Sequence, residues 1–211
     1  MVNALPLFPL QIVVFPGEKL KLHIFEPRYR QLIQECRELH ITFGIPAFLE
    51  GRVAEYGTEM RLEEISHTYE DGRMDILTEG VGAFQLLEFQ RQMPEKPYPG
   101  GTVQRIANDE NVFPITIEEI AKQYESFHKL LKTGRVRERF DVPNLSFQIA
   151  QEVGLTLEQK VQLLSIPKES DRQLMIVDHL HRTIPAIQGI EEMKRRIRAN
   201  GHFRKFPPIR L

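Results

Sequence analysis

The sequence has little of what cross-links a chain or anchors it in a membrane. Cys36 is the single cysteine among 211 residues, so no intramolecular disulfide can form. No run reaches the roughly 18 apolar residues that suggest a membrane-spanning helix. The N-terminus also lacks a basic stretch followed by a signal-type apolar core. We therefore expect a cytoplasmic protein without a membrane partner. Because Cys36 falls on an apolar helical stripe, we expect a buried, inert thiol there.

Sequence motifs that carry catalysis are also missing. A phosphate-binding loop needs the pattern GxxxxGK[ST], and the nearest match, PGEK at residues 16–19, lacks the second glycine and the hydroxyl. None of the five serines stands in a Gly-x-Ser-x-Gly elbow. His179 and His181 are two residues apart, a spacing that points helical side chains to different faces. We therefore expect no enzyme activity, no metal site and no cofactor.

The composition is that of an ordinary globular protein, with 41% hydrophobic and 27% charged residues. The charge is unevenly distributed. Residues 193–211 hold seven of the 28 basic residues and none of the 29 acidic ones, so the rest of the chain is net −8. A basic end of this kind contacts nucleic acid or an acidic partner, or folds back on the chain. The seven candidate contact residues are Lys194, Arg195, Arg196, Arg198, Arg204, Lys205 and Arg210.

The first half of the sequence has the two-residue period of β-strands. Residues 5–7 and 10–14 form short apolar runs between prolines, which fit strands joined by tight turns. Residues 20–24 (LKLHI) alternate apolar and polar side chains and predict a strand with one buried face. Pro27 then fits the first turn of a helix. The apolar stripe of that helix comprises Tyr29, Leu32, Ile33, Cys36 and Leu39.

More strands are predicted up to about residue 106. The buried run at 41–50 (ITFGIPAFLE) predicts a strand with a bend or an edge. Asp71-Gly72 is a strong hairpin signal between strands at 61–69 and 74–77, and a further strand is predicted at 81–89. The prolines and glycines of residues 93–101 indicate a loop, after which the chain returns to the sheet.

From about residue 114 the period changes to the 3.6 residues of a helix. Two pairs match the capping box that starts a helix, namely Thr116 with Glu119 and Thr156 with Gln159. A shorter helix is predicted between them, over residues 145–153. A last helical segment follows Pro167.

The long last segment contains Pro185, which should kink it or divide it in two. Strands followed by helices predict an α+β protein. We expect a sheet-rich subdomain over residues 1–110 and a helical subdomain with a basic tail over residues 111–211. Because the helical stripes must bury their apolar faces, the two halves should pack together.

Residues 5–29, LPLFPLQIVVFPGEKLKLHIFEPRY, resemble the start of the Lon N-terminal domain, the substrate-recognition module that precedes the ATPase and peptidase parts of Lon proteases. The resemblance continues through FGIP at 43–46, YGT at 56–58, DGRMDILTEG at 71–80 and the segments 145–150 and 154–164. It implies a PUA-like β pseudo-barrel followed by a helical bundle. The family usually has arginine where this chain has Ala83. Too few residues follow for an ATPase or a peptidase, so we expect a stand-alone recognition domain.

The resemblance implies a non-catalytic module that binds unfolded or exposed apolar segments of partner proteins, as an adaptor in proteolysis. Glu26 and Arg28 flank Pro27 in FEPRY and either fix a corner through an ion pair or line the mouth of a peptide groove. Exposed aromatic surface nearby would serve such a groove. The candidate peptide-binding residues are Phe25, Glu26, Arg28, Tyr29, Phe43 and Pro46.

A nucleic-acid binder, of RNA above all, is the alternative. A PUA-like fold and a basic tail suggest it, but analogy between folds is weak support for a function. The predicted strands show no aromatic stacking signature for RNA. Apolar groups interleave the basic ones in residues 202–209 (HFRKFPPI), which favours a tail that folds back on the acidic body. Nucleic acid is therefore the less favoured partner.

Overall fold

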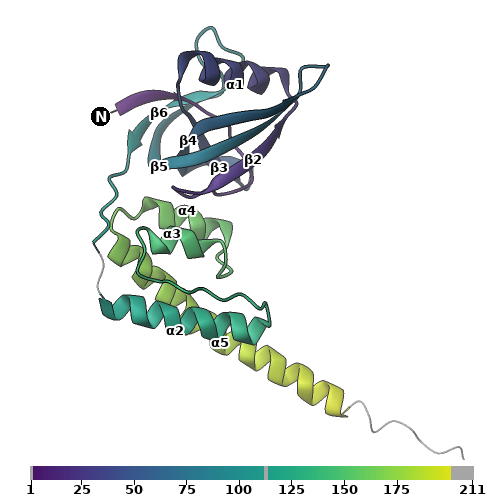
Figure 1. Ribbon diagram of the computed structural model, residues 1–211, viewed down its shortest axis with the longest axis vertical. Coiled ribbons are helices and arrows are strands. Elements are labelled where there is room, and N and C mark those ends of the chain that lie inside the picture. Colours follow the sequence, from purple (N-terminus) through teal and green to yellow (C-terminus); the bar gives the residue numbers. More distant parts are fainter. Residues whose placement is uncertain (1, 112–113, 201–211) are drawn as a thin grey trace, which may run out of the picture.

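The computed structural model describes residues 2–111 and 114–200. Six strands and one helix come first along the chain, and four more helices follow within the described residues. Figure 1 shows the strands at one end of the molecule and the later helices at the other. The predicted α+β arrangement is confirmed.

The strands form one antiparallel sheet in the order β1-β6-β5-β4-β3, and β2 pairs with β5 off this path. Two isolated bridges, Leu7 to Gly44 and Leu10 to Ala47, connect the segment after β1 to β3. The two edges of the sheet therefore meet, and the sheet closes into a barrel. The strands are β1 (Val2–Pro6), β2 (Lys19–Ile24), β3 (Phe43–Leu49), β4 (Arg52–Thr68), β5 (Met74–Gln90) and β6 (Gly100–Arg105).

The hairpin between β4 and β5 turns at Asp71-Gly72, as predicted. Gly72 has φ +82°, a conformation that glycine adopts without steric cost. The predicted break between residues 77 and 81 is wrong, because β5 is continuous from Met74 to Gln90. It stays extended because β4 pairs along most of its length, while β2 and β6 cover its first and last parts.

The segment before β2 also differs from the prediction. The run at residues 10–14 is not a strand, and Leu10 makes a single bridge there. Its apolar side chains are buried all the same, since Val13, Val14 and Phe15 are 5%, 1% and 1% exposed. Val14 packs in a cluster with Phe43 and Ile45 of β3, whereas Val13 and Phe15 pack in a cluster with residues of the helical half.

Helix α1 (Pro27–Leu39) begins with Pro27 in its first turn and ends at His40, which has the left-handed φ of 53°. Its buried stripe is the predicted one except for Leu39, which is 61% exposed in the last turn. Cys36 lies in this stripe, and burial raises the pKa of its thiol to about 12. The thiol is therefore protonated and unreactive at neutral pH, as expected.

The helical half comprises α2 (Pro114–Leu131), α3 (Leu145–Ala150), α4 (Leu157–Ser165) and α5 (Glu169–Asn200). The capping box of Thr156 and Gln159 is confirmed at the start of α4. The box predicted at Thr116 is wrong, because α2 begins at Pro114 and Thr116 lies inside its first turn. α5 continues through Pro185, so of the two predicted outcomes, a kink or a division, the division does not occur.

The two halves share one hydrophobic core. Phe15 and Ala83 of the sheet-rich half belong to the same buried cluster as Phe147 and Leu164 of the helical half. Helix α4 contacts β3, β4 and β5, and so it covers one end of the barrel. A second cluster fills the barrel interior beneath α1. The predicted packing of the sheet against the helices is therefore present.

A candidate binding cleft between the barrel and the helices

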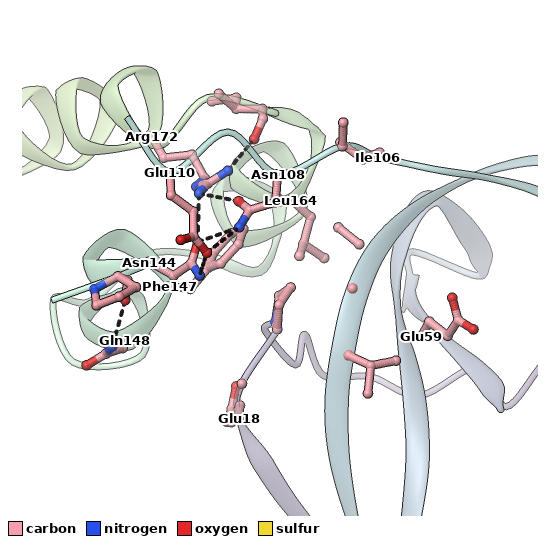
Figure 2. Close-up of a pocket in the computed structure, with 18 of the residues that line it drawn as sticks. Glu18, Glu59, Ile106, Asn108, Glu110, Asn144, Phe147, Gln148, Leu164 and Arg172 are labelled. Carbon is pink, nitrogen blue, oxygen red and sulfur yellow. Dashed lines mark hydrogen bonds between the residues drawn. The ribbon is translucent and has the colours of Figure 1, made fainter. Parts of the chain in front are cut away.

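A cleft of about 980 Å³ lies where the barrel meets the helical half (Figure 2). β5 and β6 line it on the barrel side, and α3 with the first turn of α5 lines it on the helical side. Residues 16–18, Glu59 of β4, Leu164 of α4 and residues of the connection after β6 also line it. The cleft therefore brings together segments from the beginning, middle and second half of the chain.

The barrel side of the cleft is interrupted at Val81 and Gly82. The pairing of β4 with β5 shifts register next to Glu59, which makes Val81 an extra residue in β5. The pairing of β5 with β2 stops at Glu79 and that with β6 begins at Phe84. The Val81 side chain is 40% exposed, and a Cβ on Gly82 would meet no atom within 4 Å. This bulge therefore opens apolar surface to the cleft.

The helical side depends on α3, which contacts the segment before β2. The rings of Phe15 and Phe147 stack with centroids 5.3 Å apart. The Nε2 of Gln151, just after α3, donates to the carbonyl of Val13 at 2.8 Å. Both contacts fix the distance between the barrel and α3, and with it the width of the cleft.

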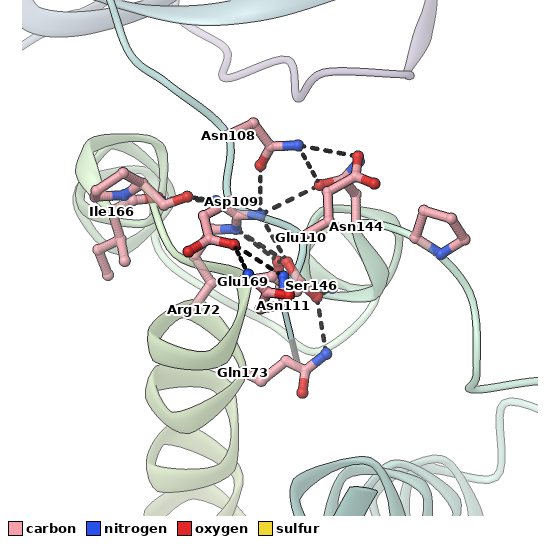
Figure 3. Close-up of polar contacts among 12 residues, drawn as sticks. Asn108, Asp109, Glu110, Asn111, Asn144, Ser146, Ile166, Glu169, Arg172 and Gln173 are labelled. Atoms are coloured by element: carbon pink, nitrogen blue, oxygen red, sulfur yellow. Dashed lines mark hydrogen bonds and ion pairs between the residues drawn. The ribbon is translucent and has the colours of Figure 1, made fainter. Parts of the chain in front are cut away.

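A buried ion pair lies at the start of α5, behind this wall (Figure 3). The Arg172 Nη2 and Glu169 Oε2 atoms are 2.8 Å apart, with side chains 1% and 0% exposed. The Glu169 carboxylate also accepts from the backbone N and the Oγ of Ser146, at 2.9 and 2.5 Å, and from Gln173 at 2.9 Å. The Glu169 carboxylate, which lies on α5, thus accepts hydrogen bonds from the first turn of α3.

The Arg172 guanidinium extends this network to the cleft lining. Its Nη1 donates to the carbonyls of Ile166 and Pro167 at 2.9 and 3.0 Å, and its Nη2 donates to Asn108 Oδ1 at 2.8 Å and Asn144 Oδ1 at 3.2 Å. All three guanidinium nitrogens have acceptors. Arg172 therefore holds the connection after β6, the start of α3 and the loop before α5 in one arrangement.

Polar side chains at the rim bond to one another. Asn108 Nδ2 donates to Asn144 Oδ1, and Asn144 Nδ2 donates to Glu110 Oε1, each at 2.9 Å. Gln148 Nε2 donates to the carbonyl of Pro143 at 2.9 Å. These polar groups at the rim therefore already have hydrogen-bond partners within the protein.

The charges on the barrel side are paired as well. Arg105 donates to both carboxylate oxygens of Glu59 at 2.6 and 2.7 Å, and Thr42 Oγ1 donates to one of them at 2.5 Å. The Arg105 hydrogen bonds lower the pKa of Glu59 below its ordinary value, against burial, which raises it. Glu59 is therefore an ionised, engaged carboxylate and not a poised proton donor.

The sequence-predicted surface around residues 25–29 is only partly accessible. Phe25 is 62% exposed, and Glu26 and Arg28 form a half-exposed ion pair at 2.8 Å. Tyr29 is 5% exposed and stacks on Phe8 with ring centroids 3.9 Å apart, and the Arg28 guanidinium covers its ring at 4.6 Å. Tyr29 is thus a core residue, which corrects its assignment to a binding surface.

Phe43 and Pro46 are corrected in the same way. Both lie in β3 with buried side chains, and Phe43 is 0% exposed in the barrel core. Phe43 packs in the barrel core, and Pro46 is buried on the opposite face of the strand, so neither has surface left for a ligand. The structure does not bring either residue together with the exposed Phe25.

The candidate basic contacts divide into two groups. Lys194, Arg195, Arg196 and Arg198 lie on the exposed last turns of α5. The other three, Arg204, Lys205 and Arg210, lie outside the described residues.

Val81, Gly82, Asn144 and Arg172 are cleft residues that sequence reasoning misses. An extra residue in one strand is a property of its pairing, and side-chain periodicity does not reveal it. Arg172 follows an acidic residue by three positions, a spacing common on exposed helices. The available signal was the polar cluster NDEN at residues 108–111, between the two halves.

Two other features, a metal site and a membrane-spanning helix, are not found in the described ranges. No group of three His, Cys, Asp or Glu side chains there is placed to hold a metal ion. Among the helices described, none combines the length and the apolar character that crossing a membrane requires.

The fold and the cleft define the class of α+β domains in which a closed antiparallel sheet shares its core with a helical bundle. The structure is similar to that of a Lon N-terminal domain protein from Xanthomonas campestris, with a TM-score of 0.66 and 24% identity over 83% of this chain and 98% of that one. It is also similar to the N-terminal domain of Mycobacterium avium complex Lon protease, with a TM-score of 0.62 and 15% identity over 85% and 98%. At these identities the likeness concerns the fold.

The particular family follows from the sequence. The family model of the ATP-dependent protease La (LON) substrate-binding domain matches residues 4–182, and the chain belongs to this family. It is also 26% identical over 137 residues to protein cereblon of Xenopus tropicalis. That match covers 62% of this chain and spans about a third of the length of the relative, 30%.

Ala83 marks a difference from the arginine usual in the family. Its side chain is 8% exposed and lies in the core shared by the two halves, at the edge of the cleft. At this position the edge of the cleft carries only a methyl group.

Proposed function

We propose that the chain recognises exposed apolar segments of unfolded polypeptides and that the cleft between the barrel and the helices receives them. Membership of a substrate-binding domain family supports a recognition role. The volume of the cleft supports its use as the site, because ligand pockets measure about 300–1,000 Å³. A few side chains of an extended peptide fill such a space.

The contrast between the rim and the floor of the cleft carries the proposal. At the floor, Val81 is 40% exposed and Ile106 is partly buried, so apolar area remains open in a concave surface. At the rim, Asn108, Asn144 and Gln148 have protein partners. An apolar side chain that enters gains about 25 cal/mol per Å² of buried area. It leaves no polar group of the rim without a partner.

The proposed activity is recognition without turnover, with bound segments passed to a separate protease. The sequence has no phosphate-binding loop, and the matched family model is that of the substrate-binding domain. Purified protein should leave casein intact with or without ATP. Proteolysis that is stimulated by ATP and lost on substitution of one serine would overturn this part of the proposal.

Fluorescence anisotropy with labelled α-lactalbumin, kept unfolded by reduction and carboxymethylation, tests the site. Val81→Glu puts a charge on the apolar floor and should weaken binding at least about tenfold, since burying an unpaired charge is costly. Leu87→Glu is the matched control, because Leu87 lies on the same strand, is 48% exposed and does not line the cleft. Wild-type affinity in Val81→Glu would refute the cleft as the site.

Phe25→Ser provides the second arm of this experiment. Phe25 is the exposed aromatic residue of the alternative surface, next to the Glu26–Arg28 ion pair. We expect Phe25→Ser to bind the unfolded protein as the wild type does. Weakened binding in Phe25→Ser together with unchanged binding in Val81→Glu would move the site to the corner between β2 and α1.

A further inference from the structure

The outer half of α5 lies apart from the rest of the molecule. Every residue from Gln188 to Arg198 is exposed, whereas Ile176, Leu180 and Ile184 in the inner half are buried. Figure 1 shows this outer half extending into solvent past the end of α2. The inner half nucleates the helix, so the outer turns form without a packing partner of their own.

Three large apolar side chains follow one face of these outer turns. Ile190, Met193 and Ile197 are 53%, 64% and 65% exposed. Their spacing of i, i+3 and i+7 places them on one side of a helix with 3.6 residues per turn. This spacing is that of the anchor residues of a helix that binds in a groove.

The apolar stripe has basic residues on both sides. At 100° per residue, Lys194 and Arg198 flank it on one side and Arg196 on the other. Glu191 and Glu192 lie farther round the helix, and they bond to Lys194 at 2.9 Å and to Arg196 at 2.5 Å. Residues 190–198 hold four basic and two acidic side chains and are net positive.

We propose that the outer half of α5 docks in the apolar groove of an acidic partner protein. Ile190, Met193 and Ile197 would enter the groove, and Lys194 and Arg196 would face carboxylates on its two rims. This surface is separate from the cleft and goes beyond the proposed recognition of unfolded segments. The chain would then bind one particular partner protein through α5, in addition to the unfolded segments bound in the cleft.

Charge distinguishes this partner from other occupants of the stripe. A second copy that docks stripe to stripe would bring the same basic flanks together, and residues 201–211, with Arg204, Lys205 and Arg210, carry only positive charge. A membrane-surface helix carries large aromatic or leucine side chains on its apolar face, whereas this stripe is three aliphatic residues long. An acidic protein with an apolar groove complements both the apolar stripe and the basic residues beside it.

Calcium-loaded calmodulin, an acidic protein with an apolar, methionine-rich groove, is the probe for the test. Titration of labelled full chain should give a micromolar Kd that is lost when EGTA closes the groove. The variant M193S/I197S keeps the net charge and should weaken binding at least about tenfold, because two anchors are truncated. Lys194→Gln should weaken it less and reduce its dependence on salt.

The matched control is L174S/V136S, which removes two other exposed apolar side chains, 54% and 87% exposed. It should bind calmodulin within about twofold of the wild type, as surface changes elsewhere do, and so should the cleft variant Val81→Glu. Absence of binding by the full chain, or equal loss in L174S/V136S, would overturn the proposal. Binding that appears only after removal of residues 201–211 would assign the stripe to that segment. Binding to phosphatidylserine vesicles but not to calmodulin would assign it to a membrane surface.

Discussion

Arg172 and Glu169 form an ion pair 2.8 Å long from which water is almost excluded, with exposed fractions of 1% and 0%. A pair in such a place contributes little net stability by itself, because both charges lose their hydration. The main effect of the pair is to hold neighbouring segments in position. The same two side chains hold the start of α3, the connection after β6 and the loop before α5, and these segments form the helical side of the cleft.

Arg172→Met should lower the free energy of unfolding by about 3–5 kcal/mol, because Glu169 is left buried without its partner. Urea unfolding measures this change. The double variant E169Q/R172M removes both charges and should recover part of the loss. If Arg172→Met alone cost less than about 1 kcal/mol, the surface-pair range, the network would not be the buried arrangement described.

Gly80 and Gly82 make a matched pair on β5. A Cβ on Gly80 would collide with the backbone carbonyl of Phe15, whereas one on Gly82 would meet nothing within 4 Å. Gly80→Ala should therefore cost about 1–3 kcal/mol through overpacking. Gly82→Ala should stay within about 0.5 kcal/mol. Thermal unfolding of the two variants side by side checks this, and equal effects would contradict the close approach of the segment before β2.

The contact between the two halves can be measured at Phe15 and Phe147. Their rings stack across the boundary with centroids 5.3 Å apart. A double-mutant cycle with F15A and F147A should give a coupling energy of about 0.5–1.5 kcal/mol. We propose that residues 1–110 and 111–211 are subdomains that fold as one unit. A fragment of residues 1–107 as stable as the whole chain, with no coupling in the cycle, would show two independent domains.

Glu35 should make the protein sensitive to acid. Burial raises the pKa of its carboxyl, but hydrogen bonds from Lys96, Tyr98 and Gln31 outweigh burial and lower the pKa to about 2. Because the folded pKa lies below the ordinary value of 4.5, this stabilisation is present above pH 4.5 and is lost as the pH falls toward 2. It amounts to no more than about 3 kcal/mol.

Glu35→Gln removes this pH dependence. The unfolding free energy of the variant should change less between pH 4.5 and pH 2 than that of the wild type. Glu38→Gln on the exposed side of the same helix controls for the loss of one charge. Parallel curves for wild type and Glu35→Gln would show that the hydrogen bonds of Glu35 do not persist in solution.

The nucleic-acid alternative makes a prediction of its own. Electrostatic binding of single-stranded RNA would weaken with salt at a logarithmic slope of about −0.7 per phosphate contact. We expect micromolar or weaker binding at physiological salt, which is the range of electrostatic binding without base recognition. Deletion of residues 201–211 should lower the Tm if that segment docks on the acidic body. Sub-micromolar RNA binding that is lost on this deletion would favour the hypothesis of a nucleic-acid binder.

Local sequence signals predict much of the fold. The alternation in residues 20–24, Pro27 at the start of α1, the turn at Asp71-Gly72 and the capping box at Thr156 are each settled by neighbours in the sequence. The error at Thr116 is local, because α2 begins two residues earlier, at Pro114. Another error occurs where distant pairing decides: β5 stays one strand through Gly80 and Gly82 because three other strands pair with it.

The candidate site was predicted less well for the same reason. Phe43 and Pro46 are aromatic and turn-forming in sequence, but both are buried in β3. The cleft arises from the bulge at Val81 and from the network of Arg172, and both depend on segments more than twenty residues away. Side-chain type and spacing identify the strands and helices, but not the register in which they meet.

The topology of β5 also constrains how the chain folds as it is synthesised. β2 is synthesised about fifty residues before β5, with which it pairs, and β1 is synthesised nearly a hundred residues before its partner β6. Until then their backbone groups are open edges, and contacts so distant in sequence form slowly. During synthesis, a chain of this fold is therefore an unfolded polypeptide with exposed strand edges, the kind of polypeptide that the folded protein is proposed to recognise.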